Sequence, residues 1–210
     1  MGTITADFES FAMTKVPDDD LALVHASRGG DVAAFEQLVK RYDGKLLRIA
    51  QNVTHNPEDA EEAVQEAFFK AYQKLGQFRE HAKFSTWLIR ITLNESLMKL
   101  RKRRAILEQL VDNDVDADSD SERRPFDVAD WAPNPEMLYR ASEFREILIT
   151  SLQRLSPALK VVFVLRDIEE HSLRETSEIL NLTETAVKTR LSRARLQLRE
   201  DLSKYFKMPE

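Results

Sequence analysis

A long stretch in the middle of the chain lacks the periodicity of either a helix or a strand. It covers residues 112–135 and reads DNDVDADSDSERRPFDVADWAPNP. Aspartates alternate with small residues in its first half, and three prolines follow. Like charges repel one another and proline cannot continue a helix, so this composition favours a flexible linker. We therefore expect an extension over residues 1–19, a domain over 20–104, an acidic linker over 105–142 and a smaller domain over 143–210.

Charge is distributed unevenly between these parts. The formal net charge is -5, yet residues 105–142 hold ten acidic and three basic residues, a net of -7. The remainder is therefore slightly basic, at +2; within it, residues 83–104 carry +6 and residues 184–199 carry +4. Two basic segments on either side of an acidic connector indicate two surfaces for polyanions. Two ordinary solvated helix faces would explain the charge equally well.

Composition and periodicity together indicate an all-α protein made of two small helical domains. The 210 residues include only 5 Gly and 7 Pro, 32% are charged, and no run alternates convincingly between apolar and polar residues. The chain has no Cys, no stretch of 18 apolar residues and no basic start followed by an apolar run. We accordingly expect no disulfide, no membrane span, no secretory signal and a cytoplasmic location.

The segment HNPEDAEEAVQEAFFKAYQKL, residues 55–75, predicts a helix with two different faces. Asn56 is a credible N-cap, and Pro57 suits the first helical position. A solvated acidic face is the ordinary explanation for its glutamates, but an exposed Phe69 beside Gln65 favours a docking surface for a basic partner. The apolar stripe is Ala60, Ala63, Val64, Ala67, Phe68, Ala71 and Leu75, opposite Glu58, Glu61, Glu62, Gln65, Glu66 and Phe69.

The segment SLRETSEILNLTETAVKTRLSRARLQLRE, residues 172–200, predicts a helix-turn-helix. Ser172 with Glu175 forms a capping box, Asn181 can adopt the left-handed turn, and Thr183 caps the second helix. A short helix, a three-residue turn and a basic helix are typical of a motif whose second helix enters the DNA major groove. A helical hairpin within a core is the alternative, but the basic residues gather on the outer face, opposite Val187, Leu191, Ala194 and Leu198.

Three stretches together resemble bacterial RNA polymerase sigma factors of the extracytoplasmic-function (ECF) group. DAEEAVQEAFFKAY resembles the family's helix that docks on the clamp of the polymerase β′ subunit, with Gln65-Glu66 matching its Gln-Glu pair. KFSTWLIRITLNESLMKLRKRR resembles the helices that bind the minus-ten promoter element. LSPALKVVFVLRDIEEH and the helix-turn-helix after it resemble the fourth sigma domain, which binds the minus-thirty-five element. Only a linker separates the two domains, as the reduced ECF layout implies.

The resemblance implies roles for three sets of residues and for several partners. The partners are core RNA polymerase, at its β′ clamp and β flap, promoter DNA, and an anti-sigma factor that occludes these surfaces until a stress signal arrives. The implied polymerase-binding residues are Asp59, Glu62, Gln65, Glu66 and Phe69. The implied minus-ten residues are Lys83, Phe84, Trp87, Arg90, Asn94, Lys99, Arg101, Arg103 and Arg104, next to a loop over 77–84 that pockets an extruded base. The implied minus-thirty-five residues are Thr185, Lys188, Thr189, Arg190, Ser192 and Arg193.

The sequence departs from the family pattern at a few positions. Asn181 and Glu170 each stand where the family commonly has Gly. Trp87-Leu88 stands where housekeeping sigma factors have a Trp pair near the melting fork, which implies weaker intrinsic melting and stricter promoter demands.

No catalytic residue, metal site or cofactor is expected, and the chain is not expected to be an enzyme. His25, His55, His81 and His171 are scattered, no HExxH or phosphate-binding Gly-rich loop occurs, and the linker aspartates lack the Gly and terminal Glu of a calcium loop. Two other classes of protein account for only part of the sequence. A simple helix-turn-helix regulator explains residues 172–199 but not the acidic helix or the KFSTW segment. An all-helical metal- or nucleotide-dependent enzyme lacks its ligand spacing.

Overall fold

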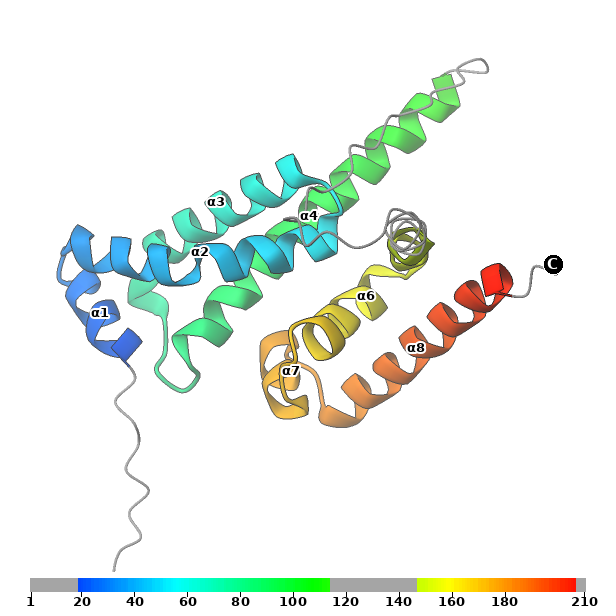
Figure 1. Ribbon diagram of the computed structural model, residues 1–210. Coiled ribbons are helices and arrows are strands. Elements are labelled where there is room, and N and C mark those ends of the chain that lie inside the picture. The colour runs from blue at the N-terminus through cyan, green and yellow to red at the C-terminus, as the bar shows by residue number, and fades with distance from the viewer. Residues whose placement is uncertain (1–18, 114–146, 207–210) are drawn as a thin grey trace, which may run out of the picture.

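The computed structural model describes residues 19–113 and 147–206, and every regular element within these ranges is helical (Figure 1). This confirms the all-α prediction. None of the helices in the described ranges is long and apolar enough to cross a membrane.

The N-terminal domain, residues 19–113, is a helical bundle. It consists of α1 (Asp19–Arg28), α2 (Val32–Thr54), α3 (Pro57–Gln73), the short 3-10 helix η1 (Leu75–Gln77) and α4 (Phe84–Asn113). Asn56 caps α3 as predicted, because its Oδ1 accepts a hydrogen bond of 2.7 Å from the backbone N–H of Asp59. The predicted apolar stripe of α3, including Ala60, Ala63 and Val64, is buried in the bundle, where α3 packs against α2 and α4.

Helix α4 is longer than expected. It continues to Asn113, past the domain boundary expected at residue 104, and it extends beyond the rest of the bundle in Figure 1. The physical reason lies in residues 101–111, which contain neither Gly nor Pro and are rich in good helix formers such as Arg, Lys, Leu and Glu. The first part of the expected linker is therefore helical, and the remainder, residues 114–142, lies outside the described residues.

The C-terminal domain, residues 147–206, contains the helix-turn-helix. It consists of a helical stretch over 147–154, then α6 (Pro157–Phe163), a π-helical turn η2 (Val164–Ile168), α7 (Leu173–Leu180) and α8 (Glu184–Phe206). Both hydrogen bonds of the predicted capping box are present, at 3.1 Å and 2.9 Å between Ser172 and Glu175. Asn181 adopts the left-handed conformation at φ 52°, and Thr183 Oγ1 accepts from the N–H of Ala186 at 3.2 Å.

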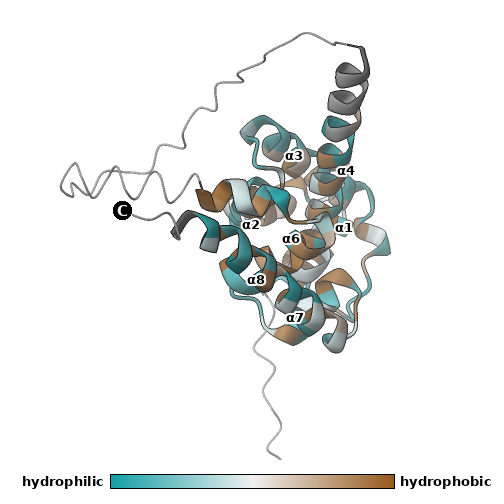
Figure 2. Ribbon diagram, turned by 90° about the vertical axis from the view of Figure 1, so that its right-hand side faces the viewer, coloured by the Kyte–Doolittle hydropathy of each residue, from teal (hydrophilic) through white to brown (hydrophobic). Residues whose placement is uncertain are grey.

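The two domains pack directly against each other. Helix α7 lies against α4, while α6 and η2 lie against α2. Val164 and Ile179 of the C-terminal domain belong to the same buried apolar cluster as Ile49 and Leu88 of the N-terminal domain. Figure 2 shows brown residues on helix faces that meet neighbouring helices and teal residues on outward faces. No sequence pattern predicted this contact, since a linker between two domains leaves their relative placement open.

Candidate polymerase-binding and nucleic-acid-binding surfaces

The acidic face of α3 is open to solvent. Glu62, Gln65 and Glu66 are exposed, and Phe69 keeps 59% of its surface accessible although it is apolar. These four side chains line a hollow together with Lys99 of α4. Asp59 lies half-buried one turn earlier on the same helix. The structure thus gathers the five residues assigned to polymerase binding on one side of α3.

Two of the cations assigned to promoter phosphates pair with this acidic face. The Nζ of Lys99 forms an ion pair with Glu62, and this hydrogen bond lowers the pKa of the Glu62 carboxyl and raises that of Lys99. The Nη1 of Arg103 lies 3.5 Å from the Oδ2 of Asp59. Exposed ion pairs contribute little to stability, so both cations remain available to another partner. Arg101 is exposed, and the side chain of Arg104 lies outside the described set.

Three aromatic rings pack where the loop over 77–84 joins α4. The ring centroids of Phe78 and Trp87 lie 5.2 Å apart, those of Phe84 and Trp87 5.8 Å, and those of Phe78 and Phe84 5.7 Å. Phe84 is completely buried, so it does not reach DNA from this position, which corrects the expectation of a direct contact. Its ring supports Trp87, which is half-buried, and Lys83 next to it is exposed.

Arg90, assigned to the minus-ten element, contacts the C-terminal domain. Its Nε donates a hydrogen bond of 2.9 Å to the carbonyl oxygen of Ile179, and its Nη2 donates to the carbonyl oxygen of Glu178. Carbonyl groups in the last turn of a helix have no intrahelical donor and favour a cation, so Arg90 satisfies the end of α7. The Nζ of Lys83 lies 3.8 Å from the Oε1 of Glu175, also in α7. Asn94, one turn after Arg90, is exposed.

Further polar contacts join the two domains at α2. Arg48 donates from Nε and Nη2 to the two carboxylate oxygens of Glu169 at 2.8 Å and 2.6 Å, and the Glu169 side chain is fully buried. His55 ends α2 at φ 51°, and burial, together with the charge of Lys160 in α6, lowers its pKa to about 4. Burial lowers the pKa of Lys160 to about 8. Sequence reasoning missed this set, because the partners are far apart along the chain and share no local pattern.

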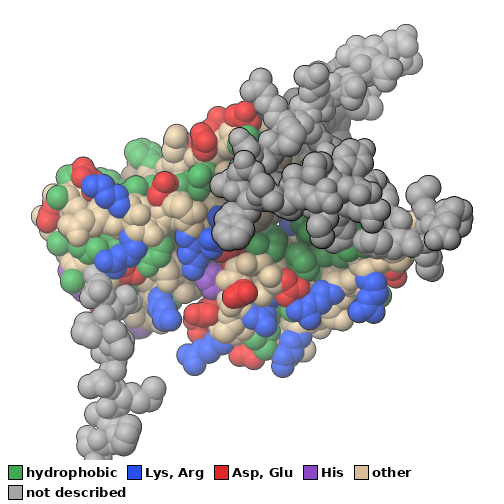
Figure 3. Space-filling model, in the orientation of Figure 1, with side chains coloured by type: hydrophobic (Ala, Val, Ile, Leu, Met, Phe, Trp, Pro, Cys, Tyr) green, Lys and Arg blue, Asp and Glu red, His purple; other side chains and the backbone are tan. Residues whose placement is uncertain are grey.

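The outer face of α8 carries the residues assigned to the minus-thirty-five element. Figure 3 shows Lys and Arg side chains along the lower edge of the molecule, where α8 runs. Arg195, by contrast, is held by Asp167 in two hydrogen bonds of 2.8 Å and 2.6 Å, so it fastens α8 to η2. The exposed members of the predicted set are Thr185, Lys188, Thr189, Ser192 and Arg193, whereas Arg190 is half-buried.

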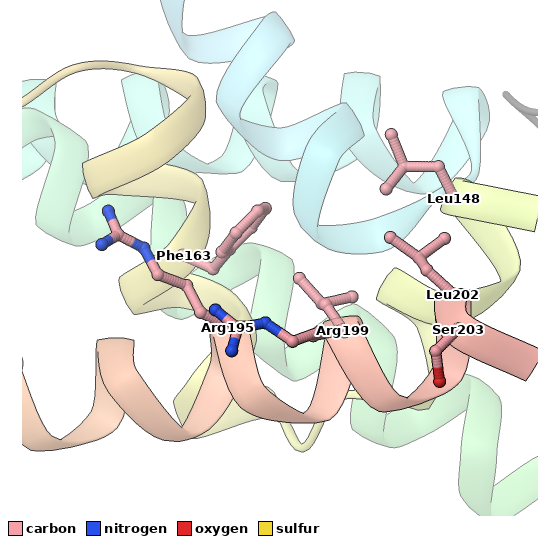
Figure 4. Close-up of a pocket in the computed structure, with 7 residues that line it drawn as sticks. Leu148, Phe163, Arg195, Arg199, Leu202 and Ser203 are labelled. Atoms are coloured by element: carbon pink, nitrogen blue, oxygen red, sulfur yellow. The ribbon is translucent and has the colours of Figure 1, made fainter.

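An apolar groove lies beside the second half of α8 (Figure 4). Leu202 was not singled out from the sequence, although it continues the series formed by Leu191 and Leu198 at helical spacing. In Figure 4, the side chains of Leu148 and Leu202 approach each other from two different helices, while Arg195 and Arg199 lie along α8. The groove is lined by Leu148, Phe163, Arg195, Leu198, Arg199, Leu202 and Ser203.

Comparisons with known proteins place the chain in a family. The Sigma-70 region 2 family matches residues 38–106, and the family described as Sigma-70, region 4 matches residues 145–198. The ECF RNA polymerase sigma factor SigW of Bacillus subtilis is 34% identical over 173 residues, which is 82% of this chain and 91% of SigW. The RNA polymerase sigma-H factor of Pseudomonas aeruginosa is 33% identical over 184 residues, covering 85% of this chain and 91% of that protein.

Solved structures show the same fold. The structure of CnrH in complex with the cytosolic domain of CnrY is similar at a TM-score of 0.62 and 26% identity, covering 89% of this chain and 98% of that one. The sigma factor RpoE from Bartonella quintana, solved with the anti-sigma factor NepR, is similar at a TM-score of 0.62 and 22% identity, covering 82% and 98%. The two family matches follow each other in the two described domains, and the relatives span most of the chain. The chain therefore belongs to the sigma-70 family of RNA polymerase sigma factors, in its ECF group.

Proposed function

We propose that the chain binds core RNA polymerase and directs it to promoters in the cytoplasm, using the α3 face for docking and the basic surfaces of α4 and α8 for DNA. The observation that carries this proposal is the exposure, within one chain, of an acidic and aromatic docking face and a basic recognition helix. RNA synthesis belongs to the polymerase, so the chain contributes no catalytic step. Its part is to select the start site and to hold the opened strand.

The α3 face fits a basic docking partner such as the β′ clamp. Phe69 provides an apolar contact at the centre, while Glu62 and Glu66 provide charge around it. The pairing of Lys99 with Glu62 fits the same assignment, because a basic partner replaces one exposed ion pair by another at little cost. The groove of the C-terminal domain, with an apolar floor and Arg195 and Arg199 on its rim, fits an amphipathic helix, and we propose that the β flap docks there.

Promoter contacts divide into two kinds. Lys188 and Thr189 lie in the first turns of α8, which in a helix-turn-helix reach base edges in the major groove. Arg193 lies further along the same face and suits the phosphate backbone. On the N-terminal domain, Trp87 packs beside the loop over 77–84, and Asn94 is exposed further along α4. Aromatic stacking of Trp87 on an opened strand is worth about 1–3 kcal/mol per base.

The packed arrangement of the two domains has to open for this function. The minus-ten and minus-thirty-five elements lie about 25 base pairs apart, which is roughly 85 Å at 3.4 Å per base pair. In the structure, Arg90 and α7 are in hydrogen-bond contact, and α7 precedes the recognition helix by one short turn. One duplex therefore cannot place both elements on their surfaces until α7 leaves α4. We propose that polymerase docking separates the domains.

We also propose that an anti-sigma factor holds the chain inactive, as the family resemblance implies. A partner that covers α4 together with the α3 face or the groove beside α8 would block DNA binding and polymerase docking at once. The structurally similar RpoE from Bartonella quintana was crystallised with its anti-sigma factor.

Docking is tested with a double substitution on α3. Gln65→Ala with Glu66→Arg should abolish co-purification with core RNA polymerase and leave the circular dichroism spectrum unchanged. Glu36→Arg, at an exposed site on α2, is the matched control and should co-purify normally. Normal co-purification of the double variant would refute the docking assignment.

A helix-turn-helix regulator that acts without polymerase is the competing function. Such a regulator shifts a specific duplex in a gel on its own. We expect the chain alone to give no specific shift and the holoenzyme to give a stable one, because the packed domains of the free chain cannot reach both promoter elements at once.

A further inference from the structure

Arg28, the last residue of α1, reaches across the bundle to the loop between α3 and α4. Its Nε donates a hydrogen bond of 3.0 Å to the carbonyl oxygen of Leu75, and its Nη2 donates to the carbonyl oxygen of Phe78. Its Nη1 lies 3.2 Å from the Oε1 of Glu80. One guanidinium thus binds two backbone carbonyls and one carboxylate of a loop that lies about fifty positions away in the sequence.

The same contacts hold the guanidinium in place. The Nε2 of His25 also lies 3.2 Å from the Oε1 of Glu80, so two side chains of α1 converge on one carboxylate. The guanidinium carbon lies 5.8 Å from the ring centroid of Phe78, within range of a cation–π contact. Phe78 is buried beside Phe84 and Trp87, which connects Arg28 to the aromatic residues at the start of α4.

The contacts of Arg28 order the loop rather than α1, because α1 is held to α2 by separate contacts at its other end. At the other end of α1, Asp20 pairs with Arg41 of α2 at 2.6 Å and accepts a hydrogen bond from the hydroxyl of Tyr42. In the loop itself, Arg79, Glu80, His81 and Lys83 are exposed. Arg28 therefore fixes the loop at Phe78 and Glu80 and leaves Arg79, His81 and Lys83 facing solvent.

We propose that Arg28 is a positioning residue that holds the loop over 77–84 in the shape that receives one unpaired base of the promoter strand. This rests on the proposed function and on the base capture that the family resemblance implies for that loop. A loop that is ordered before binding loses less conformational freedom when the base enters, so its affinity rises without any new contact. Lysine cannot replace arginine here, because a single ammonium lacks the planar fork that binds two carbonyls and a carboxylate together.

The test is a thermodynamic cycle between Arg28 and the captured base. Holoenzyme is assembled from core polymerase and the full chain, on a promoter found by mapping transcription starts after overexpression. The probe is a fork DNA whose non-template strand is single-stranded over the minus-ten element, with each nucleotide in turn replaced by an abasic site. Dissociation constants are measured for the unchanged chain, for Arg28→Lys, and for Arg41→Lys as the matched control, which changes the ion pair with Asp20 at the other end of α1.

For the unchanged chain, an abasic site at the captured position should weaken binding by about tenfold, the value of one stacked base. Arg28→Lys should weaken binding to the intact fork by a similar factor. In that variant, the abasic site should weaken binding by less than about a further twofold, since the effects of coupled sites are not additive. Arg41→Lys should keep the full abasic penalty. Glu80→Gln, an exposed change that does not threaten the fold, should reduce the penalty in the same direction as Arg28→Lys.

Several results would overturn the inference. A full tenfold penalty retained in Arg28→Lys would show that Arg28 only stabilises the bundle. If Arg28→Lys no longer binds core polymerase, the substitution affects more of the chain than the loop. If the unchanged chain shows no abasic penalty at any position, the loop receives no base, and its proposed role falls along with that of Arg28. The docking assignment would survive that result, because it is tested separately at Gln65 and Glu66.

Discussion

Arg90 of α4 donates a hydrogen bond of 2.9 Å from its Nε to the carbonyl oxygen of Ile179 in α7. A side chain assigned to the opened promoter strand thus satisfies the end of the helix that precedes the recognition helix. If Arg90 binds the opened strand as proposed, promoter DNA and α7 compete for one guanidinium. The contact between the domains therefore stabilises the closed arrangement and opposes DNA binding by the free chain.

Replacing Arg90 should open the two domains. Arg90→Gln removes charge-assisted hydrogen bonds from a half-exposed side chain, and we expect the ratio of open to closed chains to rise by about tenfold, or about 1.4 kcal/mol. The chain contains no cysteine, so spin labels at Glu36→Cys and Gln153→Cys report the distance between the domains. Arg48→Gln, which releases Glu169 far from the predicted DNA residues, should shift the distances the same way. Unchanged distances in both variants would contradict this account.

The recognition helix should contribute a salt-dependent part of promoter affinity. Substituting Lys188 and Arg193 by Gln should weaken holoenzyme binding to minus-thirty-five duplex by about tenfold or more and reduce the dependence on salt, because fewer phosphate counterions are released. Footprinting across a salt series measures both effects. Lys204→Gln changes a lysine at the far end of α8 that pairs with Asp201, and it should leave the footprint intact. An unaltered footprint in the double variant would refute the assignment of α8.

Acidification should weaken the fold through His55. Burial, and then the charge of Lys160, lower the folded pKa to about 4 from an ordinary 6.5, so the unfolded chain binds the proton first as the pH falls. This contribution to stability is complete above pH 6.5 and is lost progressively down to pH 4; the loss at pH 5 is on the order of 2 kcal/mol. Burial also lowers the pKa of His171. Urea unfolding at pH 7.5 and pH 5 measures the loss.

The control for this prediction is His55→Asn. Asparagine tolerates the left-handed backbone at φ 51° and does not titrate, so the variant should lose about 2 kcal/mol less than the unchanged chain between the two pH values. An identical pH dependence in both proteins would show that other groups control acid stability.

Glu170→Gly should stabilise the chain. Glu170 adopts φ 55°, a left-handed conformation that costs a residue with a side chain about 1–2 kcal/mol. Glycine removes that cost, but it also raises the conformational entropy of the unfolded chain, which offsets part of the gain. We expect a net increase of about 0.5–1 kcal/mol in the free energy of unfolding. Asn181→Gly should give a smaller increase, because asparagine already tolerates φ 52°. A loss of stability at position 170 would mean that the Glu170 side chain makes a contribution of its own.

Local signals in the sequence predicted the helices and caps closely. Asn56, the capping box of Ser172 and Glu175, and the left-handed Asn181 each act within four residues of their own position, so a short window contains their whole cause. The acidic face of α3 and the basic face of α8 followed from helical periodicity in the same way. The family resemblance assigned Phe84 to DNA, whereas its burial depends on Tyr42, Phe78 and Trp87, which no local pattern brings together.

Spacing along single helices is enough to predict two helical domains, a helix-turn-helix, the acidic face of α3 and the basic face of α8. The packing of whole helices is what places Arg90 against Ile179, Arg48 against Glu169 and Arg28 against the carbonyl groups of Leu75 and Phe78. These pairs join residues tens of positions apart, and nothing in either partner's neighbourhood specifies the other. These pairs form because whole helices pack together, and that packing is driven by apolar burial summed over the chain. It therefore also decides which of the residues assigned to DNA, such as Arg90, already have a partner within the chain.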